Sequence, residues 1–132
     1  MVIMILLCFL CFNKASFWGA FTLYVAYCIY APFIVPMSSI YYYSCAASLN
    51  LIVGVILQRH YLVAAMCAYA LVFTNVVGFL LWVKFYPHAL YDNISAIILI
   101  IQISSLLPKG LLNGLRRNIQ HSMAKSDGFN GF

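Results

Sequence analysis

Three long runs of this chain contain no Asp, Glu, Lys or Arg, and they cover residues 15–58, 60–83 and 93–108. A helix needs about 20 apolar residues to cross the hydrocarbon core of a bilayer. The first run would be about 66 Å long as a single helix, twice the thickness of that core, so it must turn back and hold two spans. The runs therefore predict a multi-pass membrane protein with four spans.

The composition supports a membrane environment and favours helices over strands. The chain of 132 residues is 66% hydrophobic and 7% charged, whereas soluble domains are about a quarter charged. The stretches "AIILII" and "GFLLWV" are apolar at every position, unlike the strands of a membrane barrel, which alternate. We therefore expect an all-α integral membrane protein, a bundle of four transmembrane helices, or of five if the N-terminal segment also crosses.

The expected ends of the spans follow from turn-forming residues and from length. Between the first two spans, Pro32 and Pro36 each lack a backbone donor, which predicts a turn there. Before the last span, Asp92 and Asn93 are favourable N-cap residues. The apolar stretch after them would form a helix of only about 21 Å. Extending this helix back to Ala89 gives a full span with Asp92 near the membrane surface.

The opening stretch, "MVIMILLCFLCF", is apolar on every side and lacks the basic start of a secretory signal. As a helix it would be about 18 Å long, which is short for an ordinary crossing. It is either a short fifth span or a segment that dips into the membrane. We therefore expect three parts: an N-terminal hydrophobic segment (1–14), a polytopic transmembrane helical domain (15–108) and a basic tail (109–132).

Most of the basic residues lie in this tail. Of the seven Lys and Arg in the chain, the tail contains Lys109, Arg116, Arg117 and Lys125. On a helix of 100° per residue, one arc of the tail gathers apolar side chains. These are Leu111, Leu112, Leu115, Ile119 and Met123. The pattern predicts a basic amphipathic helix on the membrane surface, where the four cations contact anionic lipid. A docking helix for another protein is the alternative.

The distribution of charge also predicts an orientation. The positive-inside rule places the tail in the cytoplasm, or on the equivalent inner side. Counting back over four spans puts Lys14 and Arg59 on that same side. Lys84 falls on the opposite side, where Asp92 offsets it. The expected partner of the basic side is an anionic inner leaflet, and nucleic acid is not expected, because the net charge of +5 flanks the spans.

Two stripes of small or polar residues recur at helical spacing and are expected to pack against other helices. One stripe consists of Ser44, Ala47, Ser48 and Gly54, and the other of Ala64, Ala68, Asn75 and Gly78. Small residues let helices approach closely in lipid, and polar ones form hydrogen bonds between them. Packing within the chain is the simpler interpretation, and packing between copies or against other subunits is the alternative.

Residues that could carry chemistry are scarce. The chain has two acidic residues, Asp92 and Asp127, which leaves no carboxylate pair for acid and base catalysis. All five cysteines lie within apolar runs. Cys8 and Cys11 have the spacing of a redox or metal pair, but no second pair or nearby base accompanies them. We expect structural cysteines and no enzyme activity, catalytic residue, metal or cofactor.

Two functions remain open on the sequence. In the first, the protein is a non-catalytic subunit or scaffold of a larger membrane assembly. In the second, it self-associates and permeabilises the membrane in the manner of a holin, or forms a channel, with Asn75 and Gln102 as candidate lining residues. No charged residue lies within a span, which disfavours proton-coupled transport. The strongly hydrophobic spans favour the first function.

Overall fold

The computed structural model describes residues 2–12, 14–84, 87 and 89–127, with their side chains except those of residues 112, 115, 122 and 124–127. Over these ranges the chain is all-helical, as the sequence predicts. Its helices are α1 (Val2–Leu10), α2 (Phe17–Ile29), which continues as a π-helical segment (Tyr30–Ile34), α3 (Ser39–Leu57), α4 (Leu62–Val83), α5 (Ala89–Leu106) and α6 (Lys109–Asp127).

Four of these elements are long and apolar enough to cross a membrane, which confirms the expected number. They are Phe17–Ile34, Ser39–Leu57, Leu62–Val83 and Ala89–Leu106, with mean hydropathies of 1.4, 1.7, 2.0 and 1.5. Helix α1 has nine residues and is about 13 Å long, less than half of the bilayer core. The described residues of α1 are therefore too few for a full span. They pack against α2.

The first turn differs in detail from the expectation, because the helix continues past Pro32. The chain there widens into a π-helical turn, in which the Val35 N–H donates to the Tyr30 carbonyl over 3.1 Å. A wider turn tolerates the missing donor and the bulk of the proline ring. The chain then reverses between Val35 and Ser38, and Ser38 has an extended backbone immediately before α3.

The predicted N-cap role of Asp92 and Asn93 is wrong, because α5 begins at Ala89. The longer start is the one that the length of a full span requires. Asp92 lies in the first turn of the helix. A negative charge in the first turn stabilises the helix start through the helix dipole.

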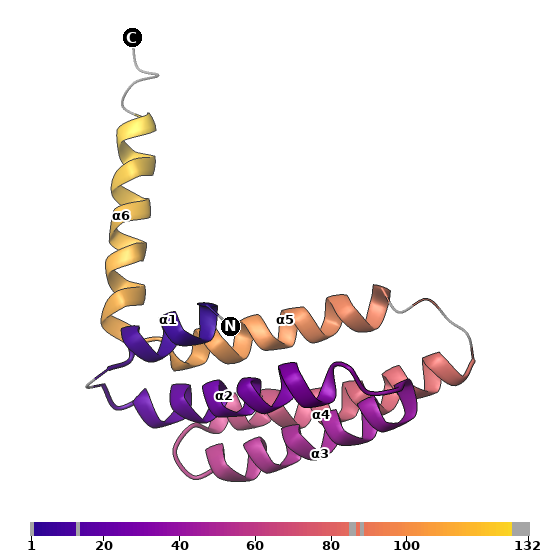
Figure 1. The fold of residues 1–132 in the computed structure, drawn as a ribbon. Helices are drawn as coiled ribbons and strands as arrows, with labels where there is room; N and C mark the ends of the chain where they lie inside the picture. The colour runs from indigo at the N-terminus through magenta and orange to yellow at the C-terminus, as the bar shows by residue number, and fades with distance from the viewer. Residues whose placement is uncertain (1, 13, 85–86, 88, 128–132) are drawn as a thin grey trace.

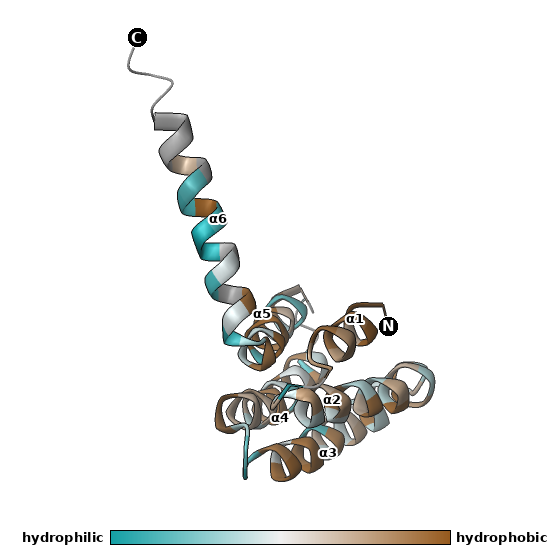
Figure 2. Ribbon diagram, turned by 90° about the vertical axis from the view of Figure 1, so that its left-hand side faces the viewer, coloured by the Kyte–Doolittle hydropathy of each residue, from teal (hydrophilic) through white to brown (hydrophobic). Residues whose placement is uncertain are grey.

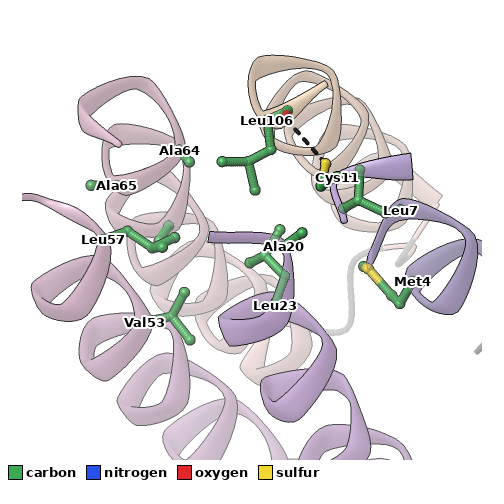
Figure 3. Close-up of a cluster of buried hydrophobic side chains, with 11 residues drawn as sticks. Met4, Leu7, Cys11, Ala20, Leu23, Val53, Leu57, Ala64, Ala65 and Leu106 are labelled. Atoms are coloured by element: carbon green, nitrogen blue, oxygen red, sulfur yellow. Dashed lines mark hydrogen bonds between the residues drawn. The ribbon is translucent and has the colours of Figure 1, made fainter. Parts of the chain in front are cut away.

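Helix α4 is the centre of the bundle, because it packs against both α3 and α5. Its small residues Ala64, Ala65 and Ala68 are fully buried and let the neighbouring helices approach closely. Helix α2 packs on α3, and α1 lies beside α5 and over α2 (Figures 1 and 2). Side chains from α1 to α5, together with Cys11 after α1, meet in one buried apolar cluster (Figure 3). In this cluster the Cys11 thiol donates a hydrogen bond to the Leu106 carbonyl over 3.4 Å.

The bundle has two distinct ends. The α1–α2 and α3–α4 connections lie at the end from which α6 departs, and the α2–α3 turn and the start of α5 lie at the other (Figure 1). Helix α6 projects from the bundle and runs across the axes of the spans, as both views show (Figures 1 and 2). With the spans upright in a bilayer, α6 is therefore parallel to the membrane plane.

Candidate functional site, a polar cavity within the bundle

A chain of hydrogen bonds ties four segments of the bundle together. The hydroxyls of Tyr30, in the π-helical segment, and Tyr42, in α3, form a hydrogen bond. The Tyr42 hydroxyl lies 3.5 Å from that of Tyr91 in α5. The Tyr91 hydroxyl donates to Asn75 Oδ1 in α4 over 2.9 Å. This series of hydrogen bonds runs from the end of the bundle opposite α6 towards the middle of α4. It links the π-helical segment, α3, α5 and α4 to one another.

Gly78 allows the helices to come close enough for this chain to form. A Cβ atom at Gly78 would lie 2.5 Å from Cδ2 and 2.7 Å from Cε2 of Tyr91, and 2.8 Å from Cε1 of Tyr43. The two tyrosine rings pack edge to face, with centroids 5.5 Å apart. The ring of Tyr91 is therefore held directly over the α4 backbone, within reach of Asn75.

A cavity of about 220 Å³ lies beside this chain of hydrogen bonds. Side chains of α1 to α5 and of the π-helical segment line it, and most are apolar. Its polar lining includes Tyr30, Asn50, Asn75, Tyr91, Ser95 and Gln102. Among the described residues that line the cavity, none is Asp, Glu, Lys, Arg or His. The cavity thus combines an apolar wall with neutral hydrogen-bonding groups inside the helical bundle.

Three side-chain amides at the cavity use their nitrogen atoms to bond backbone carbonyls. Asn50 Nδ2 donates to Ala46 O over 3.0 Å, and Asn75 Nδ2 donates to Leu71 O over 2.8 Å, each within its own helix. Gln102 Nε2 donates to the Ala64 carbonyl over 3.0 Å and so joins α5 to α4. Gln102 is only 1% exposed. Asn75 and Gln102, the candidate lining residues of the alternative channel function, thus face the interior of the chain.

The structure places the two small-residue stripes differently. On α4, Ala64, Ala68, Asn75 and Gly78 are buried within the chain. On α3, Gly54 is buried, and a Cβ there would lie 2.6 Å from Cε1 of Tyr69. Ser44 and Ser48 are exposed and Ala47 is half-buried. The two hydroxyls bond within the helix, Ser44 to Ile40 O over 3.1 Å and Ser48 to Ser44 O over 2.9 Å.

The basic residues gather at one end of the bundle. Lys109, Arg116 and Arg117 are exposed on α6, and the side chain of Lys125 lies outside the described ones. Of the predicted apolar arc, Leu111, Ile119 and Met123 are exposed, and the side chains of Leu112 and Leu115 lie outside the described ones. Lys14 and Arg59 are exposed in the α1–α2 and α3–α4 connections, which lie at the end where α6 begins (Figure 1). Lys84, directly after α4, and Asp92, in the first turn of α5, are also exposed, and these helix ends lie at the opposite end of the bundle (Figure 1).

Sequence reasoning missed the tyrosine hydroxyls of the site. The run Tyr41–Tyr43 is typical of an aromatic belt at the membrane surface, and nothing in the pattern distinguishes Tyr42 as a bonding residue. The cysteines of the described residues are free thiols. Among the described residues, no group of three or more His, Cys, Asp and Glu side chains could hold a metal ion.

Comparison with known protein families, with curated protein sequences and with solved structures finds no match for this chain. The functional conclusion therefore rests on the geometry of the chain itself: the outward face of α3, the polar cavity and the basic end.

Proposed function

We propose that the protein is a non-catalytic subunit or scaffold of a larger membrane assembly, and that the outer face of α3 binds a transmembrane helix of a partner subunit. The observation that carries this proposal is the exposed position of Ser44 and Ser48, with the half-buried Ala47 beside them, on an apolar helix. The corresponding stripe of α4 is used within the chain, where Ala64 and Ala68 are buried. The α3 stripe is therefore the one left for another protein.

The physics of helix association in lipid favours this face. Lipid tails are as apolar as leucine, so helices associate through close van der Waals packing and hydrogen bonds, and small residues one turn apart promote both. Ser44 and Ser48 are one turn apart. The most apolar stretch of α3 is 28% buried within the chain, against 44% for α4, 22% for α2 with its π-helical segment and 17% for α5. The small residues, and not the degree of burial, therefore distinguish α3 as the helix that binds a partner.

Helix α6 supplies the second part of the proposal. Because it runs across the axes of the spans at the end that carries Lys14 and Arg59 (Figure 1), it is placed to lie along the inner membrane surface. Arg116 and Arg117 then contact anionic headgroups. Each basic residue near such a leaflet contributes about 1 kcal/mol. The helix anchors the subunit and fixes its C-terminus on the cytoplasmic or equivalent inner side.

The test is the size of the particle extracted from the native membrane in a mild detergent. Ser48→Phe places a bulky ring on the outer face of α3, and Val76→Phe places the same ring on the exposed face of α4 as a control. We expect the wild-type chain and Val76→Phe in a particle larger than any oligomer of this chain alone, and Ser48→Phe displaced from it. An unchanged particle for Ser48→Phe contradicts the proposal. Ala68 is unsuited to this test, because it is 0% exposed within the chain.

Membrane potential during expression separates this function from permeabilisation. An unchanged potential at confirmed membrane expression is the expected result. A collapse that Asn75→Leu prevents would favour the permeabilising alternative. The burial of Asn75 and Gln102 within the chain means that such a pore would pass through this bundle or require its rearrangement.

A further inference from the structure

We propose that the polar cavity binds an uncharged, lipid-soluble phenol. The phenol ring and hydroxyl lie inside the bundle, and an alkyl chain leaves into the bilayer between α2 and α5. This inference is independent of the outer face of α3, since Ser44, Ala47 and Ser48 are not among the described residues that line the cavity. It rests on acceptors that are accessible in the cavity, on the size and neutrality of the cavity and on the position of its opening.

Two amide oxygens at the cavity lack a donor among the described residues. Gln102 and Asn50 each donate through their nitrogen atom to a backbone carbonyl, and no described residue donates to Gln102 Oε1 or Asn50 Oδ1. Both residues line the cavity, and Gln102 is 1% exposed. Among the described residues, each buried side-chain nitrogen or oxygen atom has a hydrogen-bond partner. These two oxygens have none, so they are accessible atoms of the cavity lining and are open to a donor. A hydroxyl donor from a bound molecule satisfies Gln102 Oε1, which a ligand with acceptors alone cannot do.

The volume and the lining of the cavity indicate the size and the charge of the ligand. An apolar cavity of about 150 Å³ accommodates benzene, so the cavity of about 220 Å³ has room for an aromatic ring with its hydroxyl. Aliphatic side chains such as Leu23, Val53 and Leu71 supply the apolar wall. The part of the lining that the structure describes has no charged residue, and an ion without a partner is costly in the membrane interior. The ligand is therefore neutral.

The opening of the cavity lies between two helices that make few direct contacts. Ala26 on α2 is half-buried and Ala96 on α5 is exposed, and both line the cavity. Their side chains are short, and α2 and α5 make few direct contacts, so we place the opening between them. Met4 of α1, which belongs to the buried cluster of Figure 3, also lines the cavity. A molecule dissolved in the bilayer can enter here without crossing water.

Photolabelling of the full chain in membranes tests this site. The probe is an alkylphenol with a diazirine on its chain, and the unmodified alkylphenol serves as competitor. We expect saturable labelling of the wild-type chain. Ala96→Phe, which closes the opening, should abolish it. Ile97→Phe adds the same ring to the neighbouring outward position, which does not line the cavity, and should leave labelling unchanged.

A separate comparison tests the proposed hydrogen bond from the ligand hydroxyl to Gln102 Oε1. Gln102→Leu keeps the bulk of the side chain and removes the acceptor, so the concentration for half-saturation should rise about fivefold to tenfold, the factor of one neutral hydrogen bond. The methyl ether of the probe, which lacks the donor, should label the wild-type chain more weakly by a similar factor. The proposal is overturned if labelling is not saturable, if Ala96→Phe labels as well as Ile97→Phe, or if the ether labels as well as the phenol.

Discussion

Among the described glycines, Gly78 is the one at which an added Cβ comes closest to another atom. A single methyl group there meets the rings of Tyr91 and Tyr43, with the shortest separation only 2.5 Å. Neither ring can move aside freely. Tyr91 is buried, packs edge to face on Tyr43 and donates a hydrogen bond to Asn75. The added methyl must therefore push α5 away from α4 and lengthen that hydrogen bond.

The magnitude follows from three contributions. Overpacking of a close contact costs about 1–3 kcal/mol, and loss of the hydrogen bond between Tyr91 and Asn75 costs about 0.6–1.7 kcal/mol in a membrane protein. The better helix propensity of alanine returns about 1 kcal/mol. We expect a net decrease of about 2 kcal/mol in the free energy of unfolding.

Reversible unfolding of the purified protein in mild-detergent micelles, titrated with a denaturing detergent, measures this difference. Gly114→Ala is the matched control, because a Cβ at Gly114 in α6 meets no atom within 4 Å. It should leave the unfolding of the bundle unchanged or make α6 slightly more stable. If Gly78→Ala unfolds at the same denaturant concentration as the wild-type chain, the close approach of α4 and α5 described above is wrong.

Three further predictions concern other parts of the molecule. Tyr91→Phe removes the hydrogen bond to Asn75 and should lower the free energy of unfolding by about 0.6–1.7 kcal/mol in the same titration; no loss would mean that this bond contributes nothing. Cysteines replacing Lys14 and Lys84 should react with a membrane-impermeant maleimide from opposite sides, and labelling from one side would refute the arrangement of the spans. A peptide of residues 109–127 should gain helical circular dichroism on anionic vesicles and much less on zwitterionic ones, whereas equal gain would exclude an electrostatic anchor.

The spans were predictable because a bilayer imposes simple requirements on length and charge. The uncharged runs and the need for about 20 apolar residues predicted four spans. The same length requirement predicted that α5 begins at Ala89, although Asp92 and Asn93 are favourable N-cap residues. Pro32 shows the opposite case. Its missing donor predicts a break, but the chain widened into a π-helical turn, which depends on hydrogen bonds that sequence alone does not specify.

The site was harder to predict because it depends on how helices are rotated against one another. The small-residue pattern identified both stripes but could not tell that α4 turns its stripe inward while Ser44 and Ser48 of α3 face outward. Both helices are apolar on all sides, so hydrophobic periodicity gives no inward face. The contact between Tyr42 and Tyr91 joins residues far apart in sequence, and only the assembled bundle brings them together.

The most direct test of the central claim is photocrosslinking in the native membrane from a photoreactive amino acid that replaces Ser48, with the same amino acid at Val76 as the comparison. If the outer face of α3 binds a partner subunit, the Ser48 position should yield a defined crosslinked product with another membrane protein, and the Val76 position should yield lipid adducts alone. Lipid adducts alone from both positions would contradict the claim, and a product containing only copies of this chain would favour self-association instead.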